Sequence, residues 1–148
     1  MKIKHYCAYQ ERCHTDVKEK LYTMGLSKSS VEQIISKLIE EDYLNEERFA
    51  RLFASGHFRQ KKWGINKIVY ALKQKKVSEY NIKRAIKEID PLEYLSVAEK
   101  IGQSKWDSLK GEQYIARENK TKLYLQQKGY ELGLIQSIIQ KIRHNPES

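Results

Sequence analysis

Glycine, proline and cysteine are all scarce in this chain of 148 residues, which has seven, two and two of them. So little glycine and proline argues against the closely spaced turns of an all-β fold, and no run alternates polar and apolar residues between hairpin turns. Two cysteines cannot build a disulfide scaffold. No apolar run approaches the ~18 residues needed to cross a bilayer, and residues 1–6 lack the apolar stretch of a signal peptide. We therefore expect a cytoplasmic protein with no membrane partner.

Residues suited to metal binding or catalysis do not form a recognisable set. His5, Cys7, Cys13 and His14 are of types that ligate zinc, but their spacing contains no CxxC or HxxxH pair. On a helix Cys7 and Cys13 would point about 240° apart, so we predict small buried side chains instead of a metal site. The phosphate-loop, dinucleotide, metalloprotease and hydrolase motifs are missing too. The sequence thus predicts no catalytic residue, no metal and no cofactor, and we expect a protein that is not an enzyme.

Helix-forming residues dominate the chain, and apolar residues recur three and four positions apart in residues 31–39, 65–72 and 135–142. An apolar helix, a tight turn and a second apolar helix occur three times, with the turns near residues 24–27, 75–78 and 128–131. A further helix is expected before each pair, around residues 4–12, 46–59 and 91–103. We therefore predict an all-α protein of three-helix repeats, residues 1–45, 46–89 and 90–148, stacked into an elongated, curved array. A polar connection is expected inside the third repeat, at residues 104–112.

The turn residues support these boundaries. Gly25 and Gly129 stand where a left-handed residue is preferred after a helix, and Lys76 holds that place in the second repeat. A lysine there costs up to about 1 kcal/mol. Asp90 precedes a proline at the first helical position, and Glu93 is placed to complete a capping box. The other expected N-caps are Ser27, Asn45 and Ser78.

The formal net charge of +9 is concentrated in the middle of the chain. Residues 1–47 hold seven Lys or Arg against nine Asp or Glu, and residues 89–148 hold nine against eight. Residues 48–88 hold twelve against two. If these side chains were only solvated surface residues, positive and negative charges would be mixed at helical spacing, as they are in residues 1–47 and 89–148. The middle block therefore favours an anionic partner, either a phosphate backbone or an acidic protein surface.

The segment from Arg48 to Lys76 holds the candidates for binding such a partner. Its first helix is expected to bury Phe49, Leu52, Phe53 and Gly56, with basic residues on a neighbouring face. Trp63 follows in a short turn, where it would either contact a base or a protein pocket or hold two helices together. The candidate binding residues are Arg48, Arg51, Arg59, Lys61, Lys62, Trp63, Lys67, Lys73, Lys75 and Lys76.

Residues 43–50, Tyr-Leu-Asn-Glu-Glu-Arg-Phe-Ala, resemble the signature that joins the first two repeats of RecX proteins. The likeness covers about residues 6–142 and is strongest in residues 40–90. Positions that match the spacing of that family's central unit are Arg59, Gly64, Ile68, Leu72 and Val77.

The resemblance implies a regulator of the RecA recombinase in DNA repair, recombination and the SOS response. Such a protein lies in the groove of the RecA–DNA filament, binds RecA together with single-stranded DNA or other nucleic acid within the filament, and inhibits or modulates the recombinase. We expect it to be a monomer. Two alternatives stay open from the residues themselves: a stand-alone helical nucleic-acid-binding module without a recombinase partner, and a helical scaffold for an acidic protein.

Overall fold

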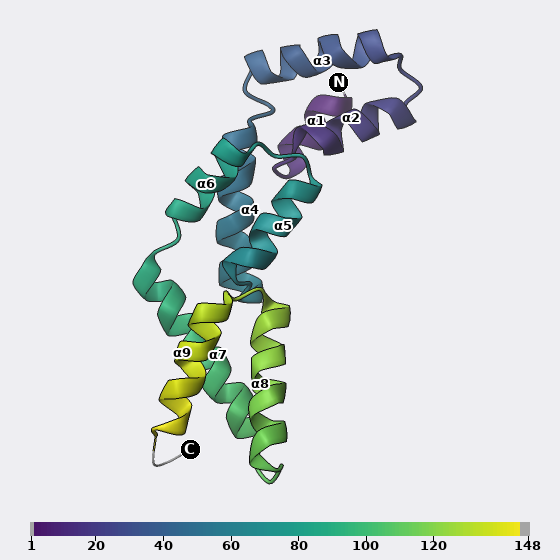
Figure 1. Cartoon of the computed structure of the whole chain (residues 1–148). Helices are drawn as coiled ribbons and strands as arrows, with labels where there is room; N and C mark the ends of the chain where they lie inside the picture. The colour runs from purple at the N-terminus through teal and green to yellow at the C-terminus, as the bar shows by residue number, and fades with distance from the viewer. Residues whose placement is uncertain (1, 146–148) are drawn as a thin grey trace. The chain divides into compact units, whose positions relative to one another are not determined.

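The computed structural model describes residues 2–145, and all regular structure in that range is helical, as predicted. No strand occurs in this range, and none of its helices has the length and apolarity to pass through a membrane. Figure 1 shows the helices in chain order. They are α1 (Lys2–Tyr9), α2 (His14–Thr23), α3 (Lys28–Glu40), α4 (Glu46–Lys61), α5 (Ile65–Gln74), α6 (Glu79–Lys87), α7 (Pro91–Ser108), α8 (Tyr114–Lys128) and α9 (Leu132–Arg143).

The three repeated turns have the left-handed residue that the sequence predicts. Gly25 and Gly129 have φ angles of +83° and +99°, and Lys76 has a φ angle of +63°. Lys76 therefore adopts a conformation that a residue with a Cβ atom rarely takes. The second repeat keeps the turn of the other two without their glycine.

Most of the predicted helix starts are confirmed by their hydrogen bonds. The side chains of Ser27 and Ser78 each accept from the backbone amide three residues later. Asn45 accepts from an amide in the first turn of α4 at 2.9 Å. Asp90 is the N-cap of α7 and Pro91 follows it, but the Asp90 side chain makes no capping hydrogen bond. The predicted capping box at this position is therefore wrong, although the acidic side chain still suits the positive end of the helix dipole.

The connection inside the third repeat is shorter than predicted, because α7 continues to Ser108. Trp106 in this last part of α7 is only 1% exposed. The guanidinium carbon of Arg117 lies 4.0 Å from the centre of the indole ring, and Arg117 Nε donates to the Trp106 carbonyl at 2.8 Å. Burial of this large ring keeps residues 104–108 helical, so that residues 109–113 form the connection.

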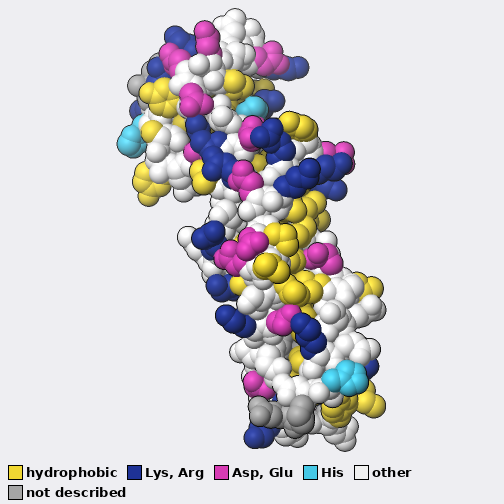
Figure 2. All heavy atoms as spheres, turned by 90° about the vertical axis from the view of Figure 1, so that its left-hand side faces the viewer, with side chains coloured by type: hydrophobic (Ala, Val, Ile, Leu, Met, Phe, Trp, Pro, Cys, Tyr) yellow, Lys and Arg dark blue, Asp and Glu magenta, His cyan; other side chains and the backbone are white. Residues whose placement is uncertain are grey.

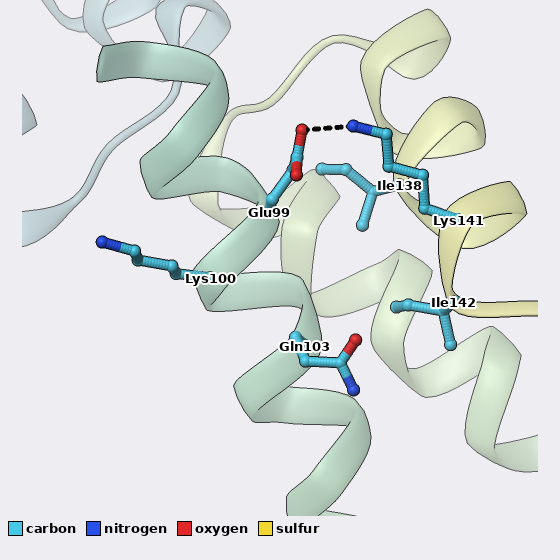
Figure 3. A pocket seen from close by; sticks show the side chains of 6 residues that line it. All are labelled: Glu99, Lys100, Gln103, Ile138, Lys141 and Ile142. Carbon is cyan, nitrogen blue, oxygen red and sulfur yellow. Dashed lines mark hydrogen bonds and ion pairs between the residues drawn. The ribbon is translucent and has the colours of Figure 1, made fainter. Parts of the chain in front are cut away.

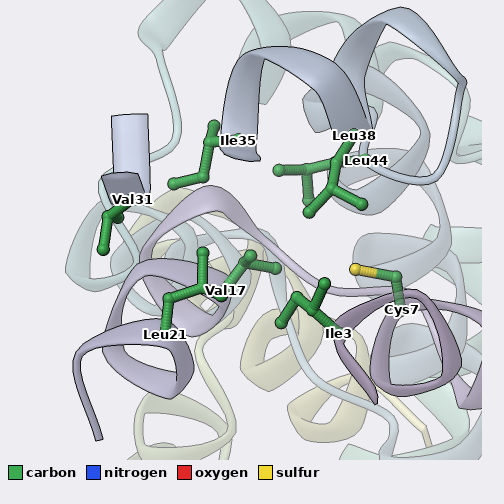
Figure 4. Close-up of a cluster of buried hydrophobic side chains, with 8 residues drawn as sticks. All are labelled: Ile3, Cys7, Val17, Leu21, Val31, Ile35, Leu38 and Leu44. Carbon is green, nitrogen blue, oxygen red and sulfur yellow. The ribbon is translucent and has the colours of Figure 1, made fainter. Parts of the chain in front are cut away.

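The tertiary contacts divide the chain into two compact units. Unit 1 contains residues 2–55 and 71–88 of the described chain. Its core joins α1, α2 and α3, and both cysteines are buried as predicted, with Cys7 6% and Cys13 1% exposed. Figure 4 shows the eight side chains of this core, which are Ile3, Cys7, Val17, Leu21, Val31, Ile35, Leu38 and Leu44.

Unit 2 contains residues 56–70 and 89–145 of the described chain. Its helices α7, α8 and α9 all contact one another. Three aromatic rings pack in sequence, with 5.7 Å between the ring centres of Phe58 and Tyr94 and 5.4 Å between those of Tyr94 and Tyr130. The apolar stripe of α9 is buried in this unit, at Ile135, Ile138, Ile139 and Ile142.

The buried stripe of α4 differs from the predicted one. Phe49 is buried as predicted, but Leu52 is 46% exposed, and Ala50, Ala54 and Phe58 are buried as well. Positions four residues apart lie on one face of a helix, and a residue two positions from Ala50 points about 200° away. The row of Ala50, Ala54 and Phe58 forms the inward face here, so Leu52 is left facing outward.

Candidate binding surface

The ten candidate residues are divided between the two units. Arg48, Arg51, Lys73, Lys75 and Lys76 belong to unit 1. The other five belong to unit 2, and they are Arg59, Lys61, Lys62, Trp63 and Lys67. Figure 2 shows basic and acidic side chains interleaved over one face of the protein, so a sequence count of charge does not by itself identify where positive charge is unopposed.

In unit 1, Arg48 is bound to two carboxylates. Its Nε lies 2.8 Å from Glu11 Oε1 and its Nη1 lies 3.2 Å from Asp42 Oδ2. The guanidinium also donates to the Asp42 carbonyl at 3.1 Å. The hydrogen bond with Glu11 is the main cause that raises the pKa of Arg48. This arginine joins the first turn of α4 to the segments that follow α1 and α3, and little of its charge is left for an external anion.

Two other basic residues of unit 1 have acidic neighbours. Lys75 Nζ lies 3.5 Å from Asp16 Oδ1, and the Lys75 carbonyl accepts from Thr15 Oγ1 at 2.9 Å. Arg51 Nε lies 3.7 Å from Glu88 Oε2, with both side chains well exposed. Lys73 and Lys76 are exposed. Three of the five candidates in unit 1 are thus opposed by carboxylates.

In unit 2, the candidate residues surround the turn between α4 and α5. Trp63 is half-buried, and its ring centre lies 4.5 Å from that of His57. Lys61 Nζ and Lys67 Nζ lie 5.6 Å and 4.8 Å from the centre of the same indole. The tryptophan therefore packs on a helix and also holds two ammonium groups beside it.

We call Arg59, Lys61, Lys62, Trp63 and Lys67 the basic loop. Within residues 2–145, none of its four charged side chains forms an ion pair with a carboxylate. Arg59, Lys61 and Lys62 are exposed. Four positive charges without an acidic neighbour produce a local field that attracts phosphate or carboxylate groups.

The third repeat holds the basic loop in place, which the sequence did not indicate. Gly64 N donates to the Lys128 carbonyl at 2.7 Å, and Asn66 N donates to the Gly129 carbonyl at 2.9 Å. Lys128 Nζ donates to the Lys61 carbonyl at 3.0 Å, and Tyr130 Oη donates to the Lys62 carbonyl at 2.7 Å. A Cβ atom added to Gly64 would lie 2.4 Å from backbone atoms of residues 129 and 130. Glycine is therefore needed at position 64 because the two backbones approach closely there, and not because the turn must be flexible.

A buried tyrosine completes this attachment. Tyr94 Oη donates to a Glu131 carboxylate oxygen and accepts from Ile65 N at 2.9 Å. Burial and the hydrogen bond to Glu131 raise the pKa of Tyr94, so the hydroxyl stays protonated at neutral pH. The first turn of α5 is in this way fixed to α7 and to the start of α9.

A hollow of about 270 Å³ lies between α7 and α9 (Figure 3). Lys141 Nζ lies 2.7 Å from Glu99 Oε1 at its edge, so the positive charge there is opposed. Ile138 and Ile142, which belong to α9 like Lys141, also line the hollow. Lys100 also lines this hollow, so only one of its two lysines is opposed by a carboxylate. No group of three or more His, Cys, Asp or Glu side chains in residues 2–145 is placed to hold a metal ion.

The fold defines an all-α helical-repeat protein, and comparisons with known proteins identify its family. A model of the second three-helix domain of RecX matches residues 45–86, and a model of the third matches residues 92–139. Together they match more than half of the chain. The protein belongs to the RecX family, as the resemblance predicted.

Individual relatives agree with this assignment. The regulatory protein RecX of Clostridium tetani is 32% identical over 136 residues, which is 87% of this chain and 60% of the relative. That of Clostridium perfringens (strain 13) is 29% identical over 88% of this chain and 61% of the relative. The chain thus spans about 60% of the length of these two relatives. The crystal structure of RecX from Lactobacillus salivarius shares the fold, with a TM-score of 0.86, 22% identity and coverage of 96% of this chain and 92% of that chain.

Proposed function

We propose that this protein binds filaments of the RecA recombinase on single-stranded DNA and restrains the recombinase. Membership in a family of proteins named as regulators supports a regulatory role. The observation that carries the proposal is the basic loop, whose four charged side chains have no carboxylate neighbour in the described chain. A filament presents both phosphate groups and protein carboxylates, and lysine and arginine bind both.

The attachment of the loop to the third repeat supports this role. Binding immobilises side chains and loops, and that ordering opposes association. Four hydrogen bonds from Gly64, Asn66, Lys128 and Tyr130 order the backbone of the loop before any partner arrives. Most of the remaining cost is then the ordering of the lysine and arginine side chains themselves.

The test reverses the three exposed charges of the loop, Arg59→Glu, Lys61→Glu and Lys62→Glu, in one variant. On single strands, the logarithm of the binding constant falls with the logarithm of the salt concentration, with a slope of about −0.7 for each phosphate contact. Loss of three contacts therefore weakens binding roughly 100-fold at about 0.1 M salt. Co-sedimentation with RecA–DNA filaments measures the effect. A matched control reverses Lys18, Lys28 and Lys37, which are exposed lysines of unit 1. Equal binding by the two folded variants would remove the basic loop from the mechanism.

A second measurement separates this function from a stand-alone nucleic-acid binder. Binding to phosphates alone weakens steeply as salt rises, whereas contacts with the recombinase add a part that does not. We expect tighter binding to RecA-coated than to bare single-stranded DNA, with a preference that widens between about 50 and 200 mM salt. We also expect slower DNA-dependent ATP turnover by RecA. Equal affinities with parallel salt slopes would favour the stand-alone binder.

A further inference from the structure

A hollow of about 370 Å³ in unit 2 combines positive charge with an aromatic ring and takes no part in the basic loop. Five of its lining residues belong to α7, and the sixth, Tyr124, belongs to α8. No carboxylate is among them. The lining residues are Lys100, Ile101, Ser104, Lys105, Ser108 and Tyr124.

Two ammonium groups lie beside the tyrosine ring. Lys105 Nζ is 5.0 Å and Lys128 Nζ is 5.9 Å from the ring centre of Tyr124. Within residues 2–145, neither of these lysines forms an ion pair with a carboxylate, and neither does Lys100. A ring attracts an ammonium group through its quadrupole and leaves the net charge in place. The lysines are thus oriented and still able to bind an anion.

Lys128 connects this hollow to the basic loop. The same ammonium group that lies beside Tyr124 donates to the Lys61 carbonyl at 3.0 Å. Lys67 Nζ reaches the carbonyl of Gln127, the residue before Lys128, at 3.5 Å. Lysines and aromatic rings therefore follow one another without interruption from Trp63 through Lys128 to Tyr124, all within unit 2.

We propose that the hollow beside Tyr124 binds a nucleotide of single-stranded nucleic acid, whose strand continues over Lys128 to the basic loop. Tyr124 and Ile101 contact the base, and Lys100 and Lys105 contact the flanking phosphates. Single-strand-binding proteins combine positive charge with aromatic rings on which bases stack. This inference rests on the proposed function only in that a recombinase filament contains such a strand.

The shape and composition of the hollow favour a nucleotide over an acidic protein surface. Its volume of about 370 Å³ lies within the range of sites that hold a small molecule. A carboxylate would engage the lysines alone and would leave the ring and the isoleucine without a partner. A nucleotide supplies both a flat apolar face and a negative charge.

The experiment measures binding of a fluorescent oligothymidylate of about 20 nucleotides, long enough for several contacts, by anisotropy from about 50 to 200 mM salt. One variant carries Lys100→Gln and Lys105→Gln, and a second carries Tyr124→Leu. A matched control carries Lys110→Gln and Lys120→Gln, which removes two positive charges from the same unit outside the hollow. Circular dichroism verifies that each variant is folded.

The two kinds of variant should behave differently. Loss of two phosphate contacts reduces the salt slope by about 1.4 and weakens binding about 25-fold at 0.1 M salt. Loss of base stacking by Tyr124→Leu weakens binding by about fivefold or more and leaves the slope unchanged, because stacking releases no counterions. The control variant should stay within about threefold of the unchanged protein, because neither Lys110 nor Lys120 lines the hollow.

Equal affinities for the hollow variants and the control would overturn the nucleotide site. So would variants that keep their affinity for the oligonucleotide but lose binding to RecA-coated DNA, since the hollow would then contact protein. A protein that binds the oligonucleotide as expected but prefers bare to coated DNA would leave the hollow intact and overturn the proposed function. The two failures are therefore distinguishable.

Discussion

Replacing Gly64 with alanine tests how the basic loop is held. The new Cβ atom would lie 2.4 Å from Gly129 C, Gly129 O and Tyr130 N, where carbon atoms in contact normally stand about 3.5–4.0 Å apart. These are backbone atoms, so no side chain can rotate away. The loop must retreat by about 1 Å, which is the difference between the two distances.

That retreat removes the two backbone hydrogen bonds between the loop and the third repeat. Gly64 N to Lys128 O is 2.7 Å and Asn66 N to Gly129 O is 2.9 Å, so both would exceed hydrogen-bond length. Each lost bond costs about 0.5–1.5 kcal/mol, and a group left buried without a partner costs about 1–3 kcal/mol. Alanine also restricts the conformations of the unfolded chain, which raises the unfolding free energy by about 0.4–1 kcal/mol. We expect the Gly64→Ala protein to lose about 2–4 kcal/mol of unfolding free energy.

Urea denaturation followed by tryptophan fluorescence measures this loss, because Trp63 and Trp106 both belong to unit 2. With a urea m-value of about 1–3 kcal/mol/M, the midpoint should fall by roughly 1 M or more. Gly56→Ala is the matched control. A Cβ atom at Gly56, inside α4, has nothing within 4 Å, and the change should stabilise the helix by up to about 1 kcal/mol.

Two results would refute the reasoning. A Gly64→Ala protein with an unchanged midpoint would mean that the loop does not lie against residues 129 and 130. A loss of stability shared by Gly56→Ala would mean that the effect comes from glycine replacement in general and not from the close approach.

Three further predictions concern other features of the two units. Lys76→Gly should raise the unfolding free energy of the protein by roughly 0.5–1 kcal/mol in a thermal melt, because glycine relieves the φ angle of +63°; a lower melting temperature would contradict it. The hydrogen bond from Arg143 lowers the pKa of Glu118. The stability that the Glu118 carboxylate contributes is therefore fully present above pH about 4.5 and is lost as the pH falls through the lowered pKa of Glu118. Between pH about 5 and 3, a Glu118→Gln protein should therefore lose less stability than the unchanged protein in urea titrations, and equal losses would contradict this. Tyr130→Phe removes the hydrogen bond to the Lys62 carbonyl and should cost about 0.5–1.5 kcal/mol by the fluorescence assay, whereas an unchanged midpoint would show that the bond does not stabilise the loop.

The sequence by itself determined the helical class, most of the expected helix starts and the three repeated turns, since these depend on neighbouring residues. Serine at positions 27 and 78 caps the helix that follows it, and glycine at positions 25 and 129 adopts the left-handed conformation. The periodicity of apolar residues and these local signals were enough to predict an all-α chain of repeated turns. The concentration of positive charge between residues 48 and 88 was also visible directly.

Only the tertiary structure decided which of those charges are unopposed. Arg48 is paired with Glu11, 37 residues earlier, and Lys75 with Asp16, 59 residues earlier, whereas the basic loop has no such neighbour in the described chain. Likewise, the need for Gly64 arises from Gly129 and Tyr130, which approach it only after the helices pack. Ion pairs and close backbone contacts join residues that are distant in sequence. Helical periodicity reports the face on which a residue lies, but it carries no information about what that face meets.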